Sequence, residues 1–140
     1  MGLINTLAIT DSALTAQRLQ MDVIANNTAN ADTTVTSQGG PYKREEVVMV
    51  PGNMQTSNGT GLANEGVRVA AVIQDQSKPR AVYDPQNPQA NAQGYVQYPN
   101  VDPVTEMTNM MAAQRAYEAN ITVADDVKSM ASQAIDLGKG

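Results

Sequence analysis

Histidine, cysteine, phenylalanine and tryptophan are all absent from the 140-residue sequence. Without cysteine the chain can form neither a disulfide nor a thiolate metal site, and without histidine it lacks the commonest general base and metal ligand. Five tyrosines are the only aromatic residues, so an isolated monomer has little large side-chain area to bury in a core. We therefore predict a protein that is not an enzyme, with no catalytic, cofactor-binding or metal-binding residues and with a marginally stable monomer.

Positive charge is also scarce. The chain has nine Lys and Arg against 14 Asp and Glu residues, which gives a net charge of −5. Its longest basic run is Lys43-Arg44. Nucleic acids and anionic membranes require clustered cations, so neither is an expected partner. No stretch approaches the roughly 18 apolar residues of a membrane span, and the first twenty residues lack the regions of a signal peptide. We expect a chain that is soluble or is exported without signal cleavage, and that does not insert into a membrane.

The acidic residues do not form a recognisable catalytic pair. Glu45 and Glu46 would point to opposite faces of a strand, and Asp125 and Asp126 would diverge by about 100° on a helix. A carboxylate-dependent hydrolase would need Asp or Glu side chains that converge from the middle of the chain, which the sequence does not indicate. We interpret these pairs as solvated surface charges.

The first thirty residues carry the pattern of a long amphipathic helix. Alternating steps of four and three residues give a seam that is apolar at five of its eight positions, namely Leu3, Leu7, Thr10, Leu14, Gln17, Met21, Ile24 and Thr28. The run Thr10-Asp11-Ser12 offers an alternative N-cap, which would start the helix there and leave the first ten residues flexible. The asparagine-rich residues 26–33 should end the helix, because asparagine tolerates the left-handed conformation of a C-cap.

The middle of the chain, residues 34–101, is divided by frequent glycine and proline, so no long helix fits there. Four short runs have the composition of β-strands, at residues 42–50, 67–75, 80–83 and 95–98. Residues 53–65 are polar and rich in glycine, which predicts a mobile loop.

A second long helix is predicted from Pro103 to Leu137, because Asp102 suits the N-cap and no glycine or proline interrupts the run. At 1.5 Å per residue this helix spans roughly 50 Å. It carries two seams. The first seam is Ala113, Ala116, Asn120, Val123, Val127, Met130, Ala134 and Leu137; the second is Met107, Met110, Gln114, Tyr117, Ile121, Ala124, Lys128, Ala131 and Ile135.

These patterns predict an α+β fold with long helices at both ends of the chain, whose seams suit coiled-coil-like packing. The helical core domain comprises residues 1–33 and 102–140, and residues 34–101 form a middle region of β-hairpins and loops. A helix that is apolar on more than one face meets more than one neighbour, which indicates an assembly subunit. The expected assembly interface consists of Leu3, Leu7, Leu14, Met21, Ile24, Met107, Met110, Ala113, Ala116, Tyr117, Ile121, Val123, Val127, Met130, Ala134 and Leu137. The alternative is a self-contained helical hairpin, acting as a binding module or secretion adaptor, that buries the same seams within one chain.

Several segments resemble a known family. Residues 12–18 (SALTAQR) and 23–33 (VIANNTANADT) closely resemble the N-terminal signature of bacterial flagellar rod and hook proteins, and residues 83–85, 94–101, 106–107 and 113–120 look like the proximal-rod members of that family. Thr28 stands where the family usually has an apolar residue, and Asn87 where a histidine is common. The residues that match the family motif are Asn27, Ala29, Asn30, Thr33, Tyr98, Pro99, Asn100, Val101, Arg115, Tyr117 and Asn120.

The resemblance implies a structural subunit of the flagellar basal-body rod, in which the N- and C-terminal helices pair as a coiled-coil-like inner tubular layer and the β-rich region lies outside it. It implies partners that are copies of the chain, other rod subunits, and adaptor and export-gate proteins at the rod base. It also implies a location in the periplasm, reached unfolded through the flagellar type III export channel. Another axial rod subunit of the family is the nearest alternative, and the Tyr-Pro-Asn-Val run at 98–101 is the best discriminator. We expect the terminal helices to fold as they assemble.

Overall fold

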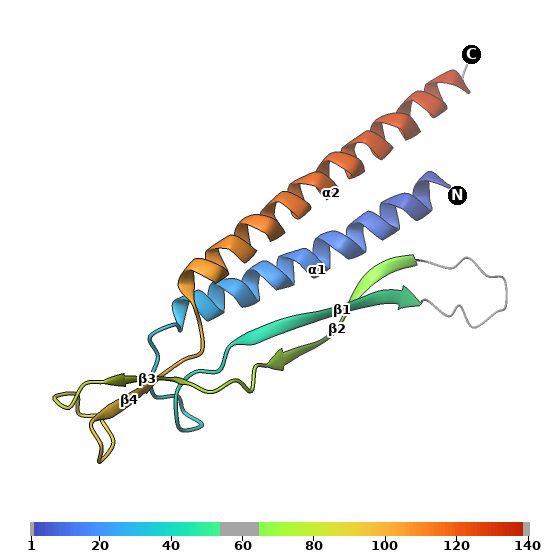
Figure 1. The fold of residues 1–140 in the computed structure, drawn as a ribbon. Coiled ribbons are helices and arrows are strands. Elements are labelled where there is room, and N and C mark those ends of the chain that lie inside the picture. The colour runs from blue at the N-terminus through green and yellow to red at the C-terminus, as the bar shows by residue number, and fades with distance from the viewer. Residues whose placement is uncertain (1, 54–64, 139–140) are drawn as a thin grey trace.

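Two long helices and two β-hairpins make up the computed structural model, which describes residues 2–53 and 65–138 (Figure 1). The predicted α+β fold is confirmed. Residues 54–64, most of the predicted mobile loop, lie outside the described part. The elements in chain order are α1 (Leu3–Ala29), β1 (Glu45–Asn53), β2 (Glu65–Gln74), β3 (Arg80–Tyr83), β4 (Tyr95–Tyr98) and α2 (Pro103–Leu137).

Helix α1 begins at Leu3, so the alternative start at residues 10–12 is wrong. The hydroxyl of Thr10 donates to the carbonyl of Thr6 at 2.9 Å. The hydroxyl of Ser12 donates to the carbonyl of Ile9 at 2.7 Å. Both side chains therefore bond to the preceding turn of a continuous helix instead of capping a new one.

The same helix ends at Ala29, inside the predicted asparagine-rich stretch. Its C-cap Asn30 has φ −103°, so the expected left-handed cap is wrong. The backbone N–H of Asn30 donates to the carbonyl of Asn26, and its side-chain amide donates to the same carbonyl at 2.9 Å. Because the side chain helps to satisfy this terminal carbonyl, the helix ends without a left-handed residue.

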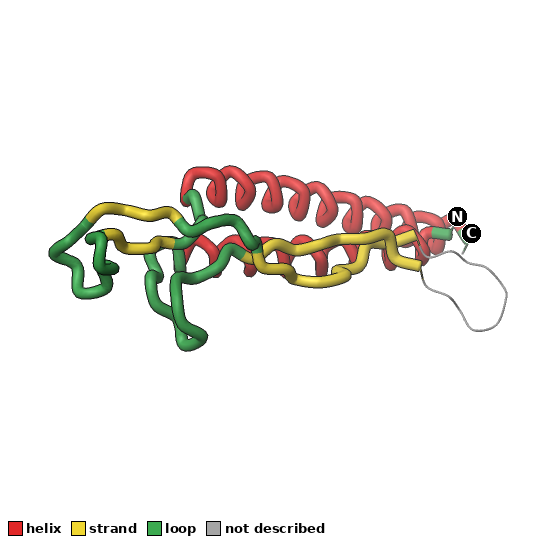
Figure 2. The backbone as a smooth tube through the Cα atoms, turned by 60° about the horizontal axis from the view of Figure 1, so that its bottom comes forward, coloured by secondary structure: helices red, strands yellow, loops and turns green. Residues whose placement is uncertain are grey.

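The two helices run antiparallel and lie side by side (Figures 1 and 2). Among the described elements, α1 is the only one that α2 contacts. A polar position of the α1 seam meets the polar position of the first α2 seam: Asn120 Nδ2 donates to Gln17 Oε1 at 3.0 Å. A matched polar pair in an apolar seam fixes the register of two helices, and the predicted pairing of the terminal helices is confirmed.

Strands β1 and β2 form an antiparallel ribbon against α1, which lies between this ribbon and α2 (Figure 1). Strand β1 starts at Glu45 instead of residue 42, because the backbone N–H of Tyr42 donates to Thr33 and that of Arg44 to the side chain of Asn100. It continues through Pro51, which a two-stranded ribbon accommodates on its free edge. A β-bulge interrupts the register after Val48.

The ribbon approaches α1 closely at Gly66. The hydroxyl of Ser12 accepts a hydrogen bond from the backbone N–H of Val67 at 3.1 Å. A Cβ atom at Gly66 would lie 2.5 Å from the Ser12 hydroxyl oxygen. A side chain at position 66 would therefore force the Ser12 side chain or the backbone around it to shift.

Strands β3 and β4 have the predicted bounds and form the second hairpin, which projects at the end of the molecule away from both termini (Figure 1). Its tyrosines pack against each other and against a cation: the Tyr83 and Tyr95 rings lie 5.3 Å apart edge to face, and Arg80 lies 5.7 Å from the Tyr98 ring.

We call the end of the helix pair where α1 finishes and α2 starts the closed end, and the other the open end. At the closed end Ala31, Val96 and Val101 are buried. At the open end Ile4 is 86% exposed, and α2 extends past the start of α1 (Figure 1). No helix of the described part is both long and apolar enough to cross a membrane.

Candidate functional site

Five polar side chains meet at the closed end in a network that we call the clasp. It joins the last turns of α1, the segment before β1, the start of β1, the link from β4 to α2, and the first turn of α2. Its members are Asn27, Tyr42, Arg44, Asn100 and Glu106.

Asn27 lies at the centre of the clasp and is completely buried. Its Nδ2 donates to the carbonyl of Glu45 at 2.8 Å and to Glu106 Oε2 at 3.1 Å. Its Oδ1 accepts from the Tyr42 hydroxyl at 3.0 Å and from the Glu45 backbone N–H at 2.9 Å. The amide therefore makes all four hydrogen bonds that its side chain can make. It fastens α1 to β1 and to α2 at one point.

Glu106 supplies the negative charge of the clasp and is 1% exposed. Its Oε1 accepts from Arg44 Nε at 2.8 Å. This hydrogen bond raises the pKa of Arg44, with further support from the nearby carboxylates. Burial raises the pKa of the Tyr42 hydroxyl, and the charges of Glu45 and Glu106 raise it further. The clasp thus holds a paired charge, which avoids the large cost of burying a lone carboxylate.

The backbone before β1 is tied to the link that precedes α2. Arg44 donates its backbone N–H to Asn100 Oδ1 at 3.1 Å, while Asn100 Nδ2 is buried without a hydrogen-bond partner in the described part of the chain. Pro99 and Val101, on either side of Asn100, are buried. The Tyr-Pro-Asn-Val run is therefore the anchored connection between the second hairpin and α2.

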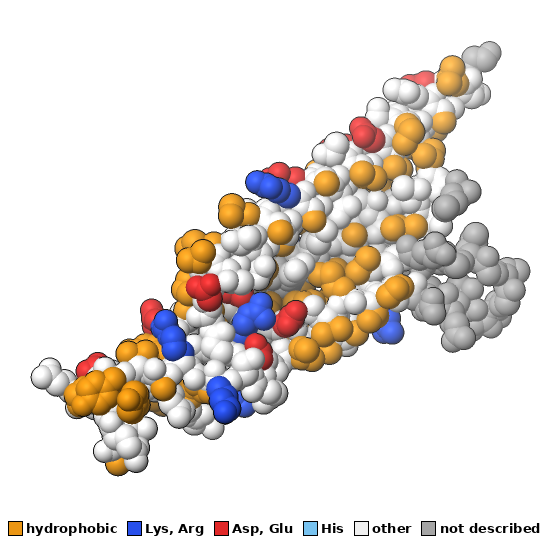
Figure 3. All heavy atoms as spheres, viewed as in Figure 1, with side chains coloured by type: hydrophobic (Ala, Val, Ile, Leu, Met, Phe, Trp, Pro, Cys, Tyr) orange, Lys and Arg blue, Asp and Glu red, His pale blue; other side chains and the backbone are white. Residues whose placement is uncertain are grey.

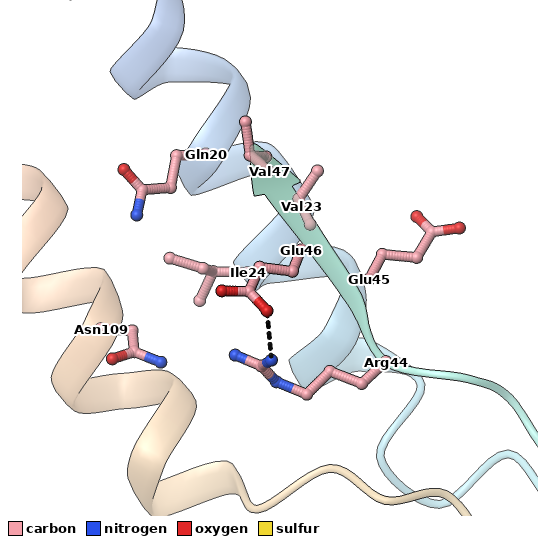
Figure 4. Close-up of a pocket in the computed structure, with 8 residues that line it drawn as sticks. All are labelled: Gln20, Val23, Ile24, Arg44, Glu45, Glu46, Val47 and Asn109. Carbon is pink, nitrogen blue, oxygen red and sulfur yellow. Dashed lines mark ion pairs between the residues drawn. The ribbon is translucent and has the colours of Figure 1, made fainter. Parts of the chain in front are cut away.

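A small pocket beside the clasp is lined from α1, β1 and α2 (Figure 4). Arg44 reaches across it to Glu46, with its terminal nitrogen 3.6 Å from Glu46 Oε2. Glu45 points to the other side of β1, as the alternation along a strand predicts. Asp125 and Asp126 are both exposed on α2. Within residues 2–53 and 65–138, no three Asp or Glu side chains gather in a group that could hold a metal ion.

The family-motif residues fall into two groups. Several have structural roles: Asn27 and Asn100 belong to the clasp, Asn120 pairs with Gln17, and Thr33 donates its hydroxyl to Asn30 Oδ1 at 3.1 Å. The others are Pro99 and Val101, which are buried, Tyr98 and Tyr117, which are half-buried, and Ala29 and Arg115, which are exposed.

Sequence reasoning missed three members of the clasp, Tyr42, Arg44 and Glu106. A glutamate in the first turns of a helix ordinarily indicates a solvated residue that favours the positive end of the helix dipole. The sequence did not indicate that Glu106 is buried, because its charged partner Arg44 lies 62 positions away.

The predicted interface residues divide by exposure. Three are buried within the chain, namely Ile24, Ala113 and Val127. Five are half-buried, namely Leu14, Met21, Met110, Ala116 and Tyr117. The exposed ones are Leu3, Leu7, Met107, Ile121, Val123, Met130, Ala134 and Leu137. Pairing of the helices within one chain thus covers part of the seams and leaves much of their apolar surface open (Figure 3).

Two open apolar grooves accompany this exposed surface. The open-end groove is lined by Ile4, Leu7, Ala8, Asp11, Leu14 and Ala124. The closed-end groove is lined by Ala25, Thr28, Ala29, Met107, Met110 and Met111. The hydroxyl of Thr28 donates to the carbonyl of Ile24 at 2.9 Å, so this departure from the family pattern adds no unpaired donor to the groove. Such surfaces can bind an apolar helix.

Comparison with known proteins gives consistent matches at both ends of the chain. Residues 7–35 match the family described as Flagella basal body rod protein, and residues 92–137 match the family described as Flagellar basal body rod FlgEFG protein C-terminal.

Matches to curated proteins extend over the whole chain. It is 45% identical to the flagellar basal-body rod protein FlgC of Escherichia coli O6:H1, over 99% of this chain and 100% of that protein. It is 42% identical to FlgC of Bacillus subtilis strain 168, over 96% and 97%, and 40% identical to FlgC of Borreliella burgdorferi, over 100% of both chains. The chain therefore belongs to the FlgC family of flagellar basal-body rod proteins, the structural subunits of the rod.

Proposed function

We propose that the chain builds the proximal part of the rod through its terminal helices, which form an inner helical layer with the β-hairpins outside it. The observation that carries this proposal is the apolar surface that both helices leave uncovered. Ile4 is 86% exposed, Val123 42% and Leu137 84%. When neighbouring subunits cover such a surface, the assembly is stabilised by roughly 25 cal/mol per Å² of apolar area buried.

Assembly also fixes the conformation of the helix turns at the open end. The clasp and the surrounding buried residues hold the closed end within a single chain, whereas the first turns of α1 and the last turns of α2 have little cover. These turns lose conformational entropy when they become fixed, and burial against neighbours offsets that loss. The expected coupling of folding to assembly is therefore concentrated at the open end.

A rod built in this way transmits torque and continues the export channel. Interdigitated side chains in many parallel contacts make the array stiff, as in a close-packed protein interior. The proposed partners are copies of this chain and other rod subunits, with adaptor and export-gate proteins at the rod base. The proposed location is the periplasm, reached unfolded through type III export without a cleaved signal; the absence of cysteine avoids disulfide mispairing after export.

A self-contained helical hairpin is the second candidate, and the pairing of α1 with α2 within one chain favours it. This candidate predicts a compact monomer whose termini are both protected from protease. The rod subunit predicts a monomer with protease-sensitive termini that become protected in the rod.

The test is complementation of a strain that lacks the gene. Deletion should abolish motility and stop the structure before the distal rod, and the wild-type chain should restore both. Val123→Asp should still be exported but should not restore motility, because an unpaired charge buried in an apolar contact costs several kcal/mol. Ser129→Asp is the matched control: it places the same charge on the exposed polar side of α2 and should restore motility.

Two outcomes would contradict the proposal: intact flagella in the deletion strain, or full activity of Val123→Asp. Val127 is less suitable for this test. It is buried within the chain, so Val127→Asp would unfold the monomer as well as block assembly.

A further inference from the structure

We propose that helix α1 sets the register of the β1–β2 ribbon by binding one outward-facing backbone site on each strand. Asn27 binds β1 near the closed end, and Ser12 binds β2 about four helical turns away. The open half of the ribbon, residues 49–53 paired with 65–69, is then ordered only while α1 is helical at Ser12. This role of α1 does not depend on assembly.

The sequence of the ribbon by itself defines its register weakly. Residues 47–50 of β1 and 69–73 of β2 are all apolar, so neither strand alternates between apolar and polar residues there. A slip by one position would still place apolar side chains on both faces. In the described part of the chain β1 and β2 pair only with each other, so no third strand holds them. Contacts with α1 must therefore select the register.

Asn27 fixes the closed half of the ribbon, residues 45–48 paired with 71–74. Its side-chain amide binds both backbone groups of Glu45, the N–H at 2.9 Å and the carbonyl at 2.8 Å. Residues of an antiparallel ladder alternate between pairs that bond to each other and pairs whose backbone groups point outward. Glu45 therefore points outward, and the amide of Asn27 occupies the place that a further strand would take.

Ser12 has the same role in the open half. Its hydroxyl donates to the Ile9 carbonyl at 2.7 Å and accepts from the Val67 N–H at 3.1 Å. Val67 lies opposite Pro51, which has no N–H, so the backbone groups of this pair also point outward. The bond to Ile9 requires a helical turn at residues 9–12. The hydroxyl is therefore presented to Val67 only while this turn is helical.

The two sites are spaced alike on the helix and on the ribbon. Ser12 and Asn27 are 15 positions apart on α1, which corresponds to about 22 Å. The pairs at Glu45 and Pro51 are six steps apart along β1, which corresponds to about 20 Å. A slip of one residue would move a site by about 3.3 Å and turn its N–H toward the opposite side. A helix of fixed length thus favours one register.

The β-bulge brings the matching residue of β2 to Ser12. A regular ladder continued from the closed half would place Arg68 opposite Pro51 and would move Val67 into the place of Gly66. A Cβ atom in that place would lie 2.5 Å from the Ser12 hydroxyl oxygen and would force it to shift. Contact with α1 therefore disfavours the ladder without the bulge, and in the observed register the same hydroxyl makes a hydrogen bond.

This arrangement couples the open half of the ribbon to the start of α1. The first turns of α1 have little cover, with Ile4 86% and Leu7 45% exposed. When these turns unwind as far as Ser12, the open half loses its site on the helix, whereas the closed half keeps Asn27. Whatever orders the first turns of α1 therefore also orders the open half of the ribbon.

Amide hydrogen exchange of the full chain, measured by NMR, tests the coupling. Because Val67 points away from β1, Ser12→Ala removes the acceptor of its N–H and should speed its exchange about tenfold. Ala8→Gly, on the exposed side of α1, weakens the helix and should speed the same amide about fivefold. Gln133→Gly is the matched control: it weakens α2, which does not contact the described strands, and should leave Val67 unchanged.

Contacts between Hα protons report the register on each side of the bulge, because outward-facing pairs bring their Cα atoms closest. In the wild type, Val47 with Val72 in the closed half and Met49 with Val69 in the open half should each give a nuclear Overhauser effect. In Ser12→Ala the first contact should remain, which shows that the variant is folded, and the second should be lost.

Two results would overturn the proposed role of α1. One is an open-half contact that keeps its full strength in Ser12→Ala, because the register would then be set without the hydroxyl. The other is exchange of Val67 in Ala8→Gly at the wild-type rate, because the open half would then be ordered independently of the start of the helix.

Discussion

Replacing Asn27 by aspartate tests whether the clasp holds the closed end together. The two side chains are nearly the same size, but the change turns the donor Nδ2 into an acceptor oxygen. In the structure Nδ2 lies 2.8 Å from the Glu45 carbonyl and 3.1 Å from Glu106 Oε2. The new carboxylate would therefore face one neutral and one charged acceptor, while the hydrogen bonds to Asn27 Oδ1 could remain.

The expected loss of stability is large. Two carboxylates whose charges are centred about 4 Å apart repel each other by about 4 kcal/mol at an effective dielectric constant of about 20. The two lost hydrogen bonds leave buried acceptors unpaired, at about 1–3 kcal/mol for each group, and Arg44 beside Glu106 offsets part of the repulsion. We expect Asn27→Asp to lose about 5 kcal/mol, a large fraction of the 5–15 kcal/mol typical of a domain.

The pH dependence separates charge repulsion from the loss of hydrogen bonds. In Asn27→Asp the repulsion raises the pKa of the introduced carboxyl in the folded state above its unfolded value. The folded state then binds a proton more readily, so the destabilisation is largest at neutral pH and decreases as the pH falls through the raised pKa. Asn27→Ala loses all four hydrogen bonds of the side chain, at about 1–3 kcal/mol for each group left unpaired, but adds no charge, so its loss of stability should not share this decrease at low pH.

The assay is urea unfolding of the purified chains, followed by far-UV circular dichroism, from about pH 7.5 to about pH 4.5, a range that spans the titration of a raised carboxyl. The decisive quantity is the difference in unfolding free energy between the aspartate and alanine variants. If the two variants lose equal stability at every pH, the charged oxygen of Glu106 does not face position 27, and the described geometry of the clasp is wrong.

Three further predictions concern the monomer. Gly66→Ala should cost about 1–3 kcal/mol in urea unfolding, because the new Cβ would lie 2.5 Å from the Ser12 hydroxyl oxygen, whereas Gly2→Ala, with nothing nearby, should cost little; equal effects would refute the close approach. The pKa of Asp102 is lowered by hydrogen bonds from the first turn of α2, so its contribution to stability is present above its ordinary pKa and is lost as the pH falls through the lowered value. The gap in melting temperature between the wild type and Asp102→Ala should therefore close on acidification, and a constant gap would contradict the cap. The pKa of Tyr42 is raised, chiefly by burial, so alkaline absorbance titration should show a late-titrating component that Tyr42→Phe removes; an unchanged curve would argue against burial of its hydroxyl.

Features encoded by neighbouring residues were predictable from the sequence. Asp102 accepts hydrogen bonds from two backbone N–H groups at the start of α2, and Pro103 occupies the first helical position, as the capping pattern predicts. The bounds of β3 and β4 are those expected from their composition. The polar breaks at Gln17 and Asn120 were visible in the seams, although only the structure shows that they pair.

Features that depend on distant residues were not predictable. The bond between Asn27 and Glu106 joins positions 79 apart, and that between Arg44 and Glu106 joins positions 62 apart. No periodicity or spacing relates such residues. The predicted start of β1 was wrong for the same reason. Residues 42–44 have suitable β composition, but the backbone N–H groups of Tyr42 and Arg44 donate hydrogen bonds to Thr33 and Asn100. Long-range contacts therefore override local propensity at the clasp.

The clasp also explains how a chain with so few large apolar residues can fix one end of its fold. Among the residues that the structure describes, the buried hydrophobic ones are alanines, valines and one isoleucine, which give little hydrophobic stabilisation. Four hydrogen bonds to one amide and a paired charge add geometric specificity there, yet each contributes only about 1 kcal/mol net because water competes for the same groups in the unfolded chain. The closed end can thus be well defined and still be unfolded at low cost, a combination suited to a subunit that we propose passes unfolded through a channel. Most of the lasting stability would then come from apolar contacts at the open end, which form only after a neighbour is present.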